Sequence, residues 1–283
     1  MEIDVVRDSI CESPFVTLTF NGKSFAFNFG KTPFNSDNAS KLINDKWALY
    51  HASRSYVARP YTEGVQIESP QKDGEVFCDI LSKINEDDHV FSFPLILKPN
   101  NGSLGRNVFL ARDEDQLSHA IKTIRADKKN GDRLIAQEYL GDEQGAFDEI
   151  RAICLDGKSQ IVFKRSTKEV IPANIMDPGK WPGLTYSEVN NQETTRQIDQ
   201  LAGHLYQQHG ISYIAFDLKL DRNGTIWLLE GNSAPMGLNH LETELPNGRQ
   251  QLEKLTDSML KKISGESFLP AMGTNIHNQS PHI

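Results

Sequence analysis

Alternating hydrophobic and polar positions near the start of the chain predict a β-hairpin. Residues 15–20 (FVTLTF) and 23–29 (KSFAFNF) alternate with the two-residue period of a strand. Between them stands Asn21-Gly22, a dipeptide that accepts the positive φ angles of a two-residue hairpin turn. We therefore expect a short hairpin in the N-terminal region.

A helix is expected after this hairpin. Ser36 is a favourable N-cap residue, and the helical pattern that follows it ends before Pro60. The apolar side of the pattern consists of Ala39, Leu42, Ile43 and Trp47. From 64 to 90 the sequence is polar and weakly periodic, which indicates a connecting segment, and we expect a new domain to begin near Phe91.

The rest of the chain alternates between strand-like and helix-like segments. Strands are expected at 93–98, 107–111, 133–138, 149–155, 159–164, 211–220 and 225–230. Helices are expected around the apolar stripes Leu117-Ala120-Ile121-Ile124, Ile198-Leu201-Ala202-Leu205 and Leu252-Leu255-Met259-Ile263. Two-residue turns are expected at Asp156-Gly157 and Asn223-Gly224. Helices that alternate with antiparallel hairpins predict α+β layers and argue against a doubly wound parallel sheet.

Composition narrows the class of protein. A net charge of -8, without a basic run, argues against a nucleic-acid partner, because phosphate backbones are neutralised by lysine and arginine. Cys11, Cys78 and Cys154 are far apart and form no CxxC pattern, so we expect free thiols. An acidic N-terminus and the lack of 18 consecutive apolar residues argue against a secretory signal and a membrane span, and favour the cytoplasm.

Two carboxylates and an amide stand on the last expected hairpin, within FDLKLDRNGTIWLLEGNSAPMG. If the turn centres on Asn223-Gly224, Asp217 pairs directly with Glu230, and Asn232 points to the same face. An oxygen-rich face of this kind suits Mg²⁺. The alternative from spacing alone is a solvated sheet edge with incidental acids.

A glycine-containing loop follows the strand that ends at Lys98. Gly102, Ser103 and Gly105 allow backbone N–H groups to approach an anion, and a nearby lysine adds positive charge for phosphate oxygens. An ordinary hairpin turn is the alternative interpretation. The loop matches neither the P-loop pattern nor the dinucleotide-binding G-x-G-x-x-G pattern.

Five segments, taken in order, resemble the ATP-grasp superfamily of carboxylate–amine ligases. They are SKLINDKWAL, FPLILKPNNGSLGRNVFL, RLIAQEYL, DEIRAICLDGK and FDLKLDRNGTIWLLEGNSAP, and they span residues 40–235. QEYL and DEIR look like the ribosomal-protein glutamate ligases, whereas NSDNASKLINDK looks like cyanophycin synthetases and glutathione-forming relatives. The D-alanine:D-alanine ligases are similar as well.

The resemblance implies a role for each matched residue. Phosphate binding is implied for Lys46 and Lys98, with the loop residues Gly102, Ser103 and Gly105 folding over the phosphates. Adenine and ribose binding is implied for Gln137, Glu138, Tyr139 and Leu140, with Asp142 or Glu143 at the ribose. Metal ligation is implied for Asp217, Glu230 and Asn232. Contacts to the transferred phosphoryl group and the acyl phosphate are implied for Arg151 and Arg165, and the alternative for Arg151 is a surface ion pair with Asp148 or Glu149. His240 and Glu242 are candidates for contact with the amine substrate, and the alternative is that His240 is an ordinary surface residue.

The implied fold is ATP-grasp, α+β, with two lobes whose antiparallel sheets grip ATP, preceded by the N-terminal hairpin. We expect a hairpin region at 1–35, a linking helix and connector at 36–90, lobes at 91–140 and 141–263, and a mobile tail at 264–283. The implied activity is ATP- and Mg²⁺-dependent amide formation through an acyl phosphate, with Mn²⁺ as a substitute metal. An amino acid or peptide is the expected substrate, and analogy suggests a homodimer. A kinase- or carboxylase-type ATP-grasp enzyme and a non-catalytic nucleotide-binding regulator are the alternatives.

Overall fold

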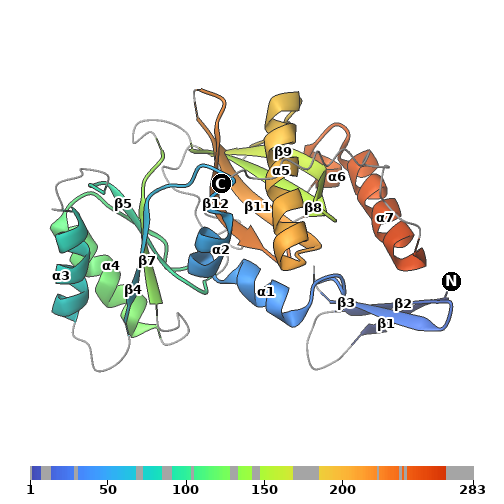
Figure 1. The fold of residues 1–283 in the computed structure, drawn as a ribbon, viewed down its shortest axis with the longest axis horizontal. Helices are drawn as coiled ribbons and strands as arrows, with labels where there is room; N and C mark the ends of the chain where they lie inside the picture. Colours follow the sequence, from blue (N-terminus) through green and yellow to red (C-terminus); the bar gives the residue numbers. More distant parts are fainter. Residues whose placement is uncertain are drawn as a thin grey trace, which may run out of the picture.

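The fold contains two antiparallel sheets that face each other and a third that projects from them (Figure 1). A computed structural model describes residues 2–7, 14–28, 31–67, 73–84, 91–102, 105–127, 133–141, 147–167, 185–221, 223–235, 238 and 241–265. No helix in these ranges combines the length and apolar character needed to cross a lipid bilayer. The tail that was expected to be mobile lies, from residue 266 on, outside the described residues.

The smaller of the two facing sheets has the strand order β4-β7-β5-β6. Its strands are β4 (Thr62–Gln66), β5 (Leu95–Pro99), β6 (Phe109–Ala111) and β7 (Arg133–Glu138). Helices α3 (Asp73–Ile84) and α4 (Glu114–Ala126) cover its outer face (Figure 1). All four residues of the stripe expected in α4 are buried in the core beneath these helices, as the helical spacing predicts.

The larger facing sheet has the order β10-β9-β8-β11-β12. Its strands are β8 (Phe147–Leu155), β9 (Lys158–Thr167), β10 (Thr185–Glu188), β11 (Tyr213–Leu220) and β12 (Ile226–Asn232). Helix α5 (Gln192–His209) packs on one face, while α6 (Leu241–Glu244) and α7 (Gly248–Ser264) pack on the other. Side chains alternate between the two cores along β11, with Phe216 facing α5 and Ala215 facing α7.

The third sheet corrects the predicted N-terminal hairpin. The expected strands are β2 (Pro14–Phe20) and β3 (Lys23–Asn28), joined by Asn21 (φ 49) and Gly22 (φ 73), so the turn is confirmed. A further strand, β1 (Glu2–Arg7), pairs with β2 and makes the sheet three-stranded. The acids and short apolar run at the N-terminus therefore form a strand, which the sequence analysis missed.

The single helix expected after Ser36 is in fact two helices. Ser36 caps α1 (Asp37–Asn44) as predicted, but Asp45 adopts an extended conformation (φ −91, ψ 105) and ends it. The Asp45 carboxylate accepts a hydrogen bond from Ala48 N (2.8 Å) and thereby caps α2 (Lys46–Ser53). A second correction concerns 64–90: the expected connector contains the end of β4 and the whole of α3.

Close packing fixes α1 and α2 against β12. A Cβ atom added to Gly231 would lie 2.7 Å from Leu49 Cδ2 and 3.3 Å from Ile43 Cγ2, so only glycine permits this approach. At the end of α1, Asn44 Oδ1 accepts hydrogen bonds from the backbone N (3.2 Å) and hydroxyl (3.0 Å) of Ser233. The first residue of α2 is therefore held beside the strand that carries Glu230.

Candidate active site

Lys98 connects the two facing sheets. It lies on β5 and is only 6% exposed. Its Nζ donates to Gln137 Oε1 (2.9 Å) on β7 and to the backbone oxygen of Leu229 (3.4 Å) on β12. Burial lowers the Lys98 pKa to about 8, because water no longer solvates the ammonium, and the negative charge of Glu230 acts in the opposite direction.

Lys46, the first residue of α2, is held at the end of β5. Its Nζ donates to Gly102 O (2.7 Å) and Asn100 O (3.4 Å) and lies 3.6 Å from Glu230 Oε2. Asn100 also fixes the start of the helix, because its Oδ1 accepts a hydrogen bond from Trp47 N (2.9 Å). Two lysines that are far apart in sequence therefore approach β12 together.

Two arginine–carboxylate pairs lie on the face of the larger sheet opposite α5. Arg151 and Asp217 are direct partners across β8 and β11, and the guanidinium donates through Nε and Nη2 to the two carboxylate oxygens, each at 2.7 Å. Arg165 and Glu149 are direct partners across β9 and β8, where Arg165 Nη2 donates to Glu149 Oε1. Arg165 Nη2 also lies 3.5 Å from Asp217 Oδ1, which joins the pairs into one network.

The charges in this network are buried, since each of the four residues is at most 8% exposed. Burial opposes the charged form of Asp217, but the adjacent Arg151 and Arg165 outweigh it and lower the Asp217 pKa. Burial also opposes the charged form of Arg151, but the negative charge of Asp217 has the larger effect and raises the Arg151 pKa. Glu149 differs, because burial dominates over Arg165 and raises its pKa to about 8. The two neighbouring carboxyls are thus driven toward opposite protonation states.

The three predicted metal ligands are close together. Asp217 and Glu230 are cross-strand partners, as the sequence predicted, and Asn232 Nδ2 donates to Asp217 Oδ2 (3.0 Å). Both oxygens of Asp217 accept hydrogen bonds from Arg151. In the described part of the chain, no group of three or more His, Cys, Asp or Glu side chains is arranged to hold a metal ion. The structure therefore shows a hydrogen-bonded ion-pair network at the residues expected to bind metal.

The predicted pairing is correct although the predicted turn is not. Asp221 N donates to Thr225 O (3.0 Å) and Gly224 N donates to Asp221 O (3.1 Å), so the loop is longer than the two-residue turn expected at Asn223-Gly224. A β-bulge restores the register: Leu218 pairs with Leu228, whereas Asp217 pairs with Glu230. The extra residue is Leu229, whose oxygen accepts the hydrogen bond from Lys98.

The predicted adenine linker lies at the end of β7. Gln137 contacts Lys98, and the Glu138 carboxylate accepts a hydrogen bond from Tyr61 N (3.1 Å) and so holds the entry to β4. Tyr139 lies against Gly141, where an added Cβ would meet its ring within 2.5 Å. Leu140 is half-buried.

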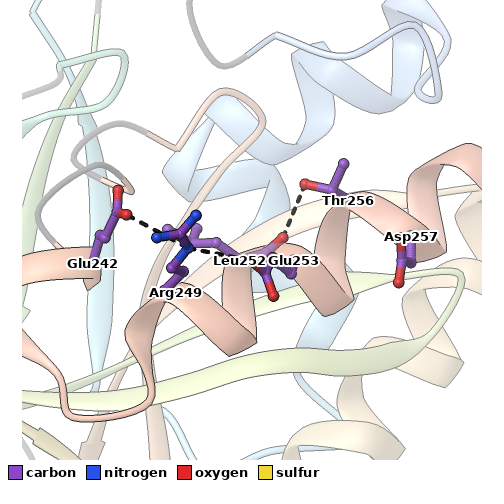
Figure 2. Close-up of a pocket in the computed structure, with 6 residues that line it drawn as sticks. All are labelled: Glu242, Arg249, Leu252, Glu253, Thr256 and Asp257. Atoms are coloured by element: carbon purple, nitrogen blue, oxygen red, sulfur yellow. Dashed lines mark hydrogen bonds and ion pairs between the residues drawn. The ribbon is translucent and has the colours of Figure 1, made fainter.

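The remaining predicted residues are more distant or are not described. Gly105 has a positive φ angle (66) in the segment between β5 and β6, and Ser103, Asp142, Glu143 and His240 lie outside the described residues. Glu242 lies on α6, where its carboxylate is 3.9 Å from Arg249 Nε of α7, at a surface hollow also lined by Glu253 (Figure 2). The structure does not place Glu242 with the arginine–carboxylate network.

Sequence reasoning missed three residues that support this arrangement: Glu149, Asn100 and Thr62. Glu149 could have been found from the alternation in DEIR, because residues 149 and 151 share one face of a strand. Asn100 and Thr62 act through hydrogen bonds from the smaller sheet, and no pattern in the sequence marks them.

Two facing antiparallel sheets with buried cations between them define the ATP-grasp class of fold. The structure is similar to a D-cycloserine synthetase (17% identity, 77% of this chain and 71% of that chain, TM-score 0.54). It is also similar to the D-alanine–D-alanine ligase of Bacillus anthracis complexed with ATP (17% identity, 81% and 70%, TM-score 0.53). A third similar structure is the ATP-grasp ligase PsnB complexed with a phosphomimetic variant of its minimal precursor, Mg and ADP (16% identity, 80% and 61%, TM-score 0.51).

The family follows from the sequence comparison. A family model described as the RimK-like ATP-grasp domain matches residues 77–248, and the chain belongs to this family. Among curated proteins, the chain is similar to the biotin carboxylase of Haemophilus influenzae, with 24% identity over 75% of this chain. The chain spans about half (51%) of the length of that relative.

Proposed function

We propose that this protein is an ATP-dependent carboxylate–amine ligase that forms an amide or peptide bond through an acyl phosphate. The observation that carries the proposal is that Lys46 and Lys98 approach β12 beside Glu230, whose cross-strand partner Asp217 is bound by Arg151. Family membership supports it, and the similar structures named above include a D-alanine–D-alanine ligase. We propose an amino acid or a peptide as the substrate.

Within this proposal, each lysine and arginine stabilises negative charge on the phosphoryl or acyl oxygens. Lys46 and Lys98 hold phosphate oxygens, the residues around Gly102 cover them, and the backbone at 137–140 reads the adenine. Arg151 and Arg165 steady the phosphoryl and acyl oxygens, because a planar guanidinium presents two parallel donors that lysine does not have. These cations are already in place before the reaction, and such preorganised charge supplies much of the rate of phosphoryl-transfer enzymes.

The donor set fits a magnesium ion in its chemistry, and manganese by the same argument. Asp217, Glu230 and Asn232 offer two carboxylates and an amide oxygen from adjacent strands, which are hard oxygen ligands. A bound divalent ion supplies positive charge that neutralises the phosphate oxygens. Since Arg151 occupies both oxygens of Asp217 and the NH₂ group of Asn232 faces one of them, we propose that metal binding requires the Arg151–Asp217 pair to open and the Asn232 amide to turn.

The test is release of ADP and phosphate from Mg-ATP with amino acids and short peptides, singly and in pairs. Turnover that requires one acid and one amine supports the ligase. We expect Asp217→Asn and Glu230→Gln to abolish it, whereas Asp199→Asn, on α5 at the opposite face of the sheet, serves as the matched control that retains it. Turnover unchanged by Asp217→Asn would refute the metal assignment.

The similarity to biotin carboxylase favours a carboxylase-type reaction as the second candidate. It predicts ADP release that requires bicarbonate and an acceptor such as biotin, without an amine. A kinase-type reaction would instead give a phosphorylated product that persists in the absence of an amine. Tight ATP binding without turnover under any of these conditions would favour a regulatory role.

The division of the chain into lobes and its oligomeric state are also proposals. We propose lobes at 91–140 and 141–263, with 36–90 divided between them: β4 and α3 complete the smaller lobe, whereas α1 and α2 pack on β12 of the larger one. The segments at 1–35 and 264–283 are attached to these lobes. A homodimer in solution is proposed by analogy. Size-exclusion chromatography with light scattering measures the mass directly, and a mass of one chain would refute the dimer.

A further inference from the structure

The ammonium of Lys98 faces an amide whose orientation is itself fixed. Gln137 Oε1 accepts from Lys98 Nζ at 2.9 Å, and Gln137 Nε2 donates to Thr62 Oγ1 at 3.0 Å. The Thr62 hydroxyl in turn donates to the backbone oxygen of Pro60 at 2.8 Å. Thr62 is 4% exposed, and Lys98 and Gln137 are each 6% exposed, so water does not replace these partners.

The chain of donors has only one consistent direction. A threonine hydroxyl carries a single proton, and at Thr62 that proton is directed to Pro60 O, which is only an acceptor. Thr62 Oγ1 therefore accepts from Gln137, which places the NH₂ group of the amide at Thr62 and its oxygen at Lys98. The strand register supports this hydrogen-bond arrangement, because Thr62 and Gln137 are direct partners across β4 and β7.

A second acceptor holds Lys98 from the other sheet. Leu229 O lies 3.4 Å from Lys98 Nζ, and Leu229 is the extra residue of the β-bulge in β12. Bulged residues leave the regular ladder, which makes their backbone groups available to other partners. The ammonium is thus held between an amide fixed by the smaller sheet and a carbonyl from the larger one.

We propose that Thr62 is a positioning residue for nucleotide binding: its hydroxyl fixes the Gln137 amide so that its oxygen, and not its NH₂ group, faces Lys98. The inference deepens the proposed function, because it assumes that Lys98 holds a nucleotide phosphate. A valine fills the same space in a buried strand equally well, so packing alone gives no reason for a hydroxyl here. Without the hydroxyl, the NH₂ group of Gln137 loses its buried acceptor, and the amide no longer holds its oxygen fixed at Lys98.

The first test uses no nucleotide. The Lys98 pKa is followed by NMR of ¹³C-labelled lysine side chains, with the resonance assigned by its loss in Lys98→Met. We expect Thr62→Val to lower this pKa by about one unit, because the Gln137 oxygen is no longer held in place and its hydrogen bond to the charged ammonium weakens. Thr62→Ser, which keeps the hydroxyl, restores the wild-type value, and Thr62→Ala replaces Thr62→Val should the latter not fold. An unchanged pKa in the hydroxyl-free variants, or a Thr62→Ser value that matches theirs, overturns the proposal.

The second test separates this inference from the proposed function. By calorimetry, Thr62→Val weakens ATP binding about tenfold and leaves adenosine binding unchanged, because only the phosphates reach Lys98. The same substitution has no further effect on ATP binding in a Lys98→Met background. Equal weakening of ATP and adenosine overturns the positioning role. If the pKa responds but the wild-type protein does not bind ATP, the proposed function fails and the positioning of Lys98 by Thr62 stands.

Discussion

Removal of the buried charge at Lys98 should change how the stability of the protein depends on pH. The Lys98 pKa is lowered from its ordinary value of 10.5 to about 8 because the ammonium is buried. Between these values the unfolded chain binds a proton that the folded chain does not, so stability rises with pH across this interval. A difference of roughly 2.5 units corresponds to about 3 kcal/mol at about 1.36 kcal/mol per unit.

The assay is urea unfolding of the wild-type protein and Lys98→Met at pH values from about 7 to 10.5, with tryptophan fluorescence as the signal. Below pH 8 the wild-type protein carries the full cost of the buried ammonium, and Lys98→Met does not. We therefore expect the stability of the wild-type protein relative to the variant to increase by about 3 kcal/mol as the pH rises from 8 to 10.5.

The control for this experiment is Lys158→Met. The Lys158 side chain is 54% exposed and pairs with Asp199 at 3.3 Å, so it measures what loss of a surface lysine does over the same pH range. A wild-type–Lys98→Met difference that stays flat between pH 8 and 10.5 would refute the reasoning. It would mean that Gln137 and Leu229 compensate the Lys98 ammonium fully for its loss of water.

Three further substitutions test other parts of the structure. Gly231→Ala should lower the free energy of unfolding by about 1–3 kcal/mol, because the added Cβ lies 2.7 Å from Leu49 Cδ2. Thermal unfolding measures this loss, and an unchanged melting temperature contradicts the close packing. Asn35→Ala should cost about 2–3 kcal/mol in urea, since its amide oxygen accepts from two backbone N–H groups at the start of β11, and a loss below 0.5 kcal/mol contradicts that anchor. Arg151→Lys should lower kcat at least about tenfold, because lysine cannot donate two parallel hydrogen bonds to Asp217. Circular dichroism should show that the variant is folded, and full activity contradicts the bidentate role.

Local sequence signals predicted most elements of the two facing sheets. The turn at Asp156-Gly157 is confirmed, since both residues have positive φ angles (49 and 76), and β7 has the predicted bounds. The stripes of α4 and α5 are buried as expected. These signals are reliable because each depends on residues only a few positions apart in the chain.

Errors occurred where a contact distant in sequence decides the structure. Asp45 was expected inside one continuous helix, yet its backbone is extended. Asn100, more than fifty positions later, accepts a hydrogen bond from Trp47 N and so holds the start of the second helix. Helix α3 is a different case: Val76, Phe77, Ile80, Leu81 and Ile84 recur at helical spacing and pack in the core of the smaller sheet, so a local signal was present and was overlooked. The predicted pairing of Asp217 with Glu230 survived an incorrect turn because a β-bulge, which the sequence does not mark, compensated for the longer loop.

Each cation of the candidate site already has a partner that resembles a phosphate oxygen. Lys46 contacts a backbone carbonyl and lies near Glu230, while Arg151 is paired with Asp217. A phosphate that binds here therefore exchanges one oxygen partner for another, and the binding energy is the difference between the two sets of contacts. The same partners hold the cations in place before binding, so little orientation entropy is lost when the phosphate arrives. Under the proposed function, Thr62 and Glu149 therefore act through the cations that they hold in place: Thr62 through Gln137 and Lys98, and Glu149 through Arg165.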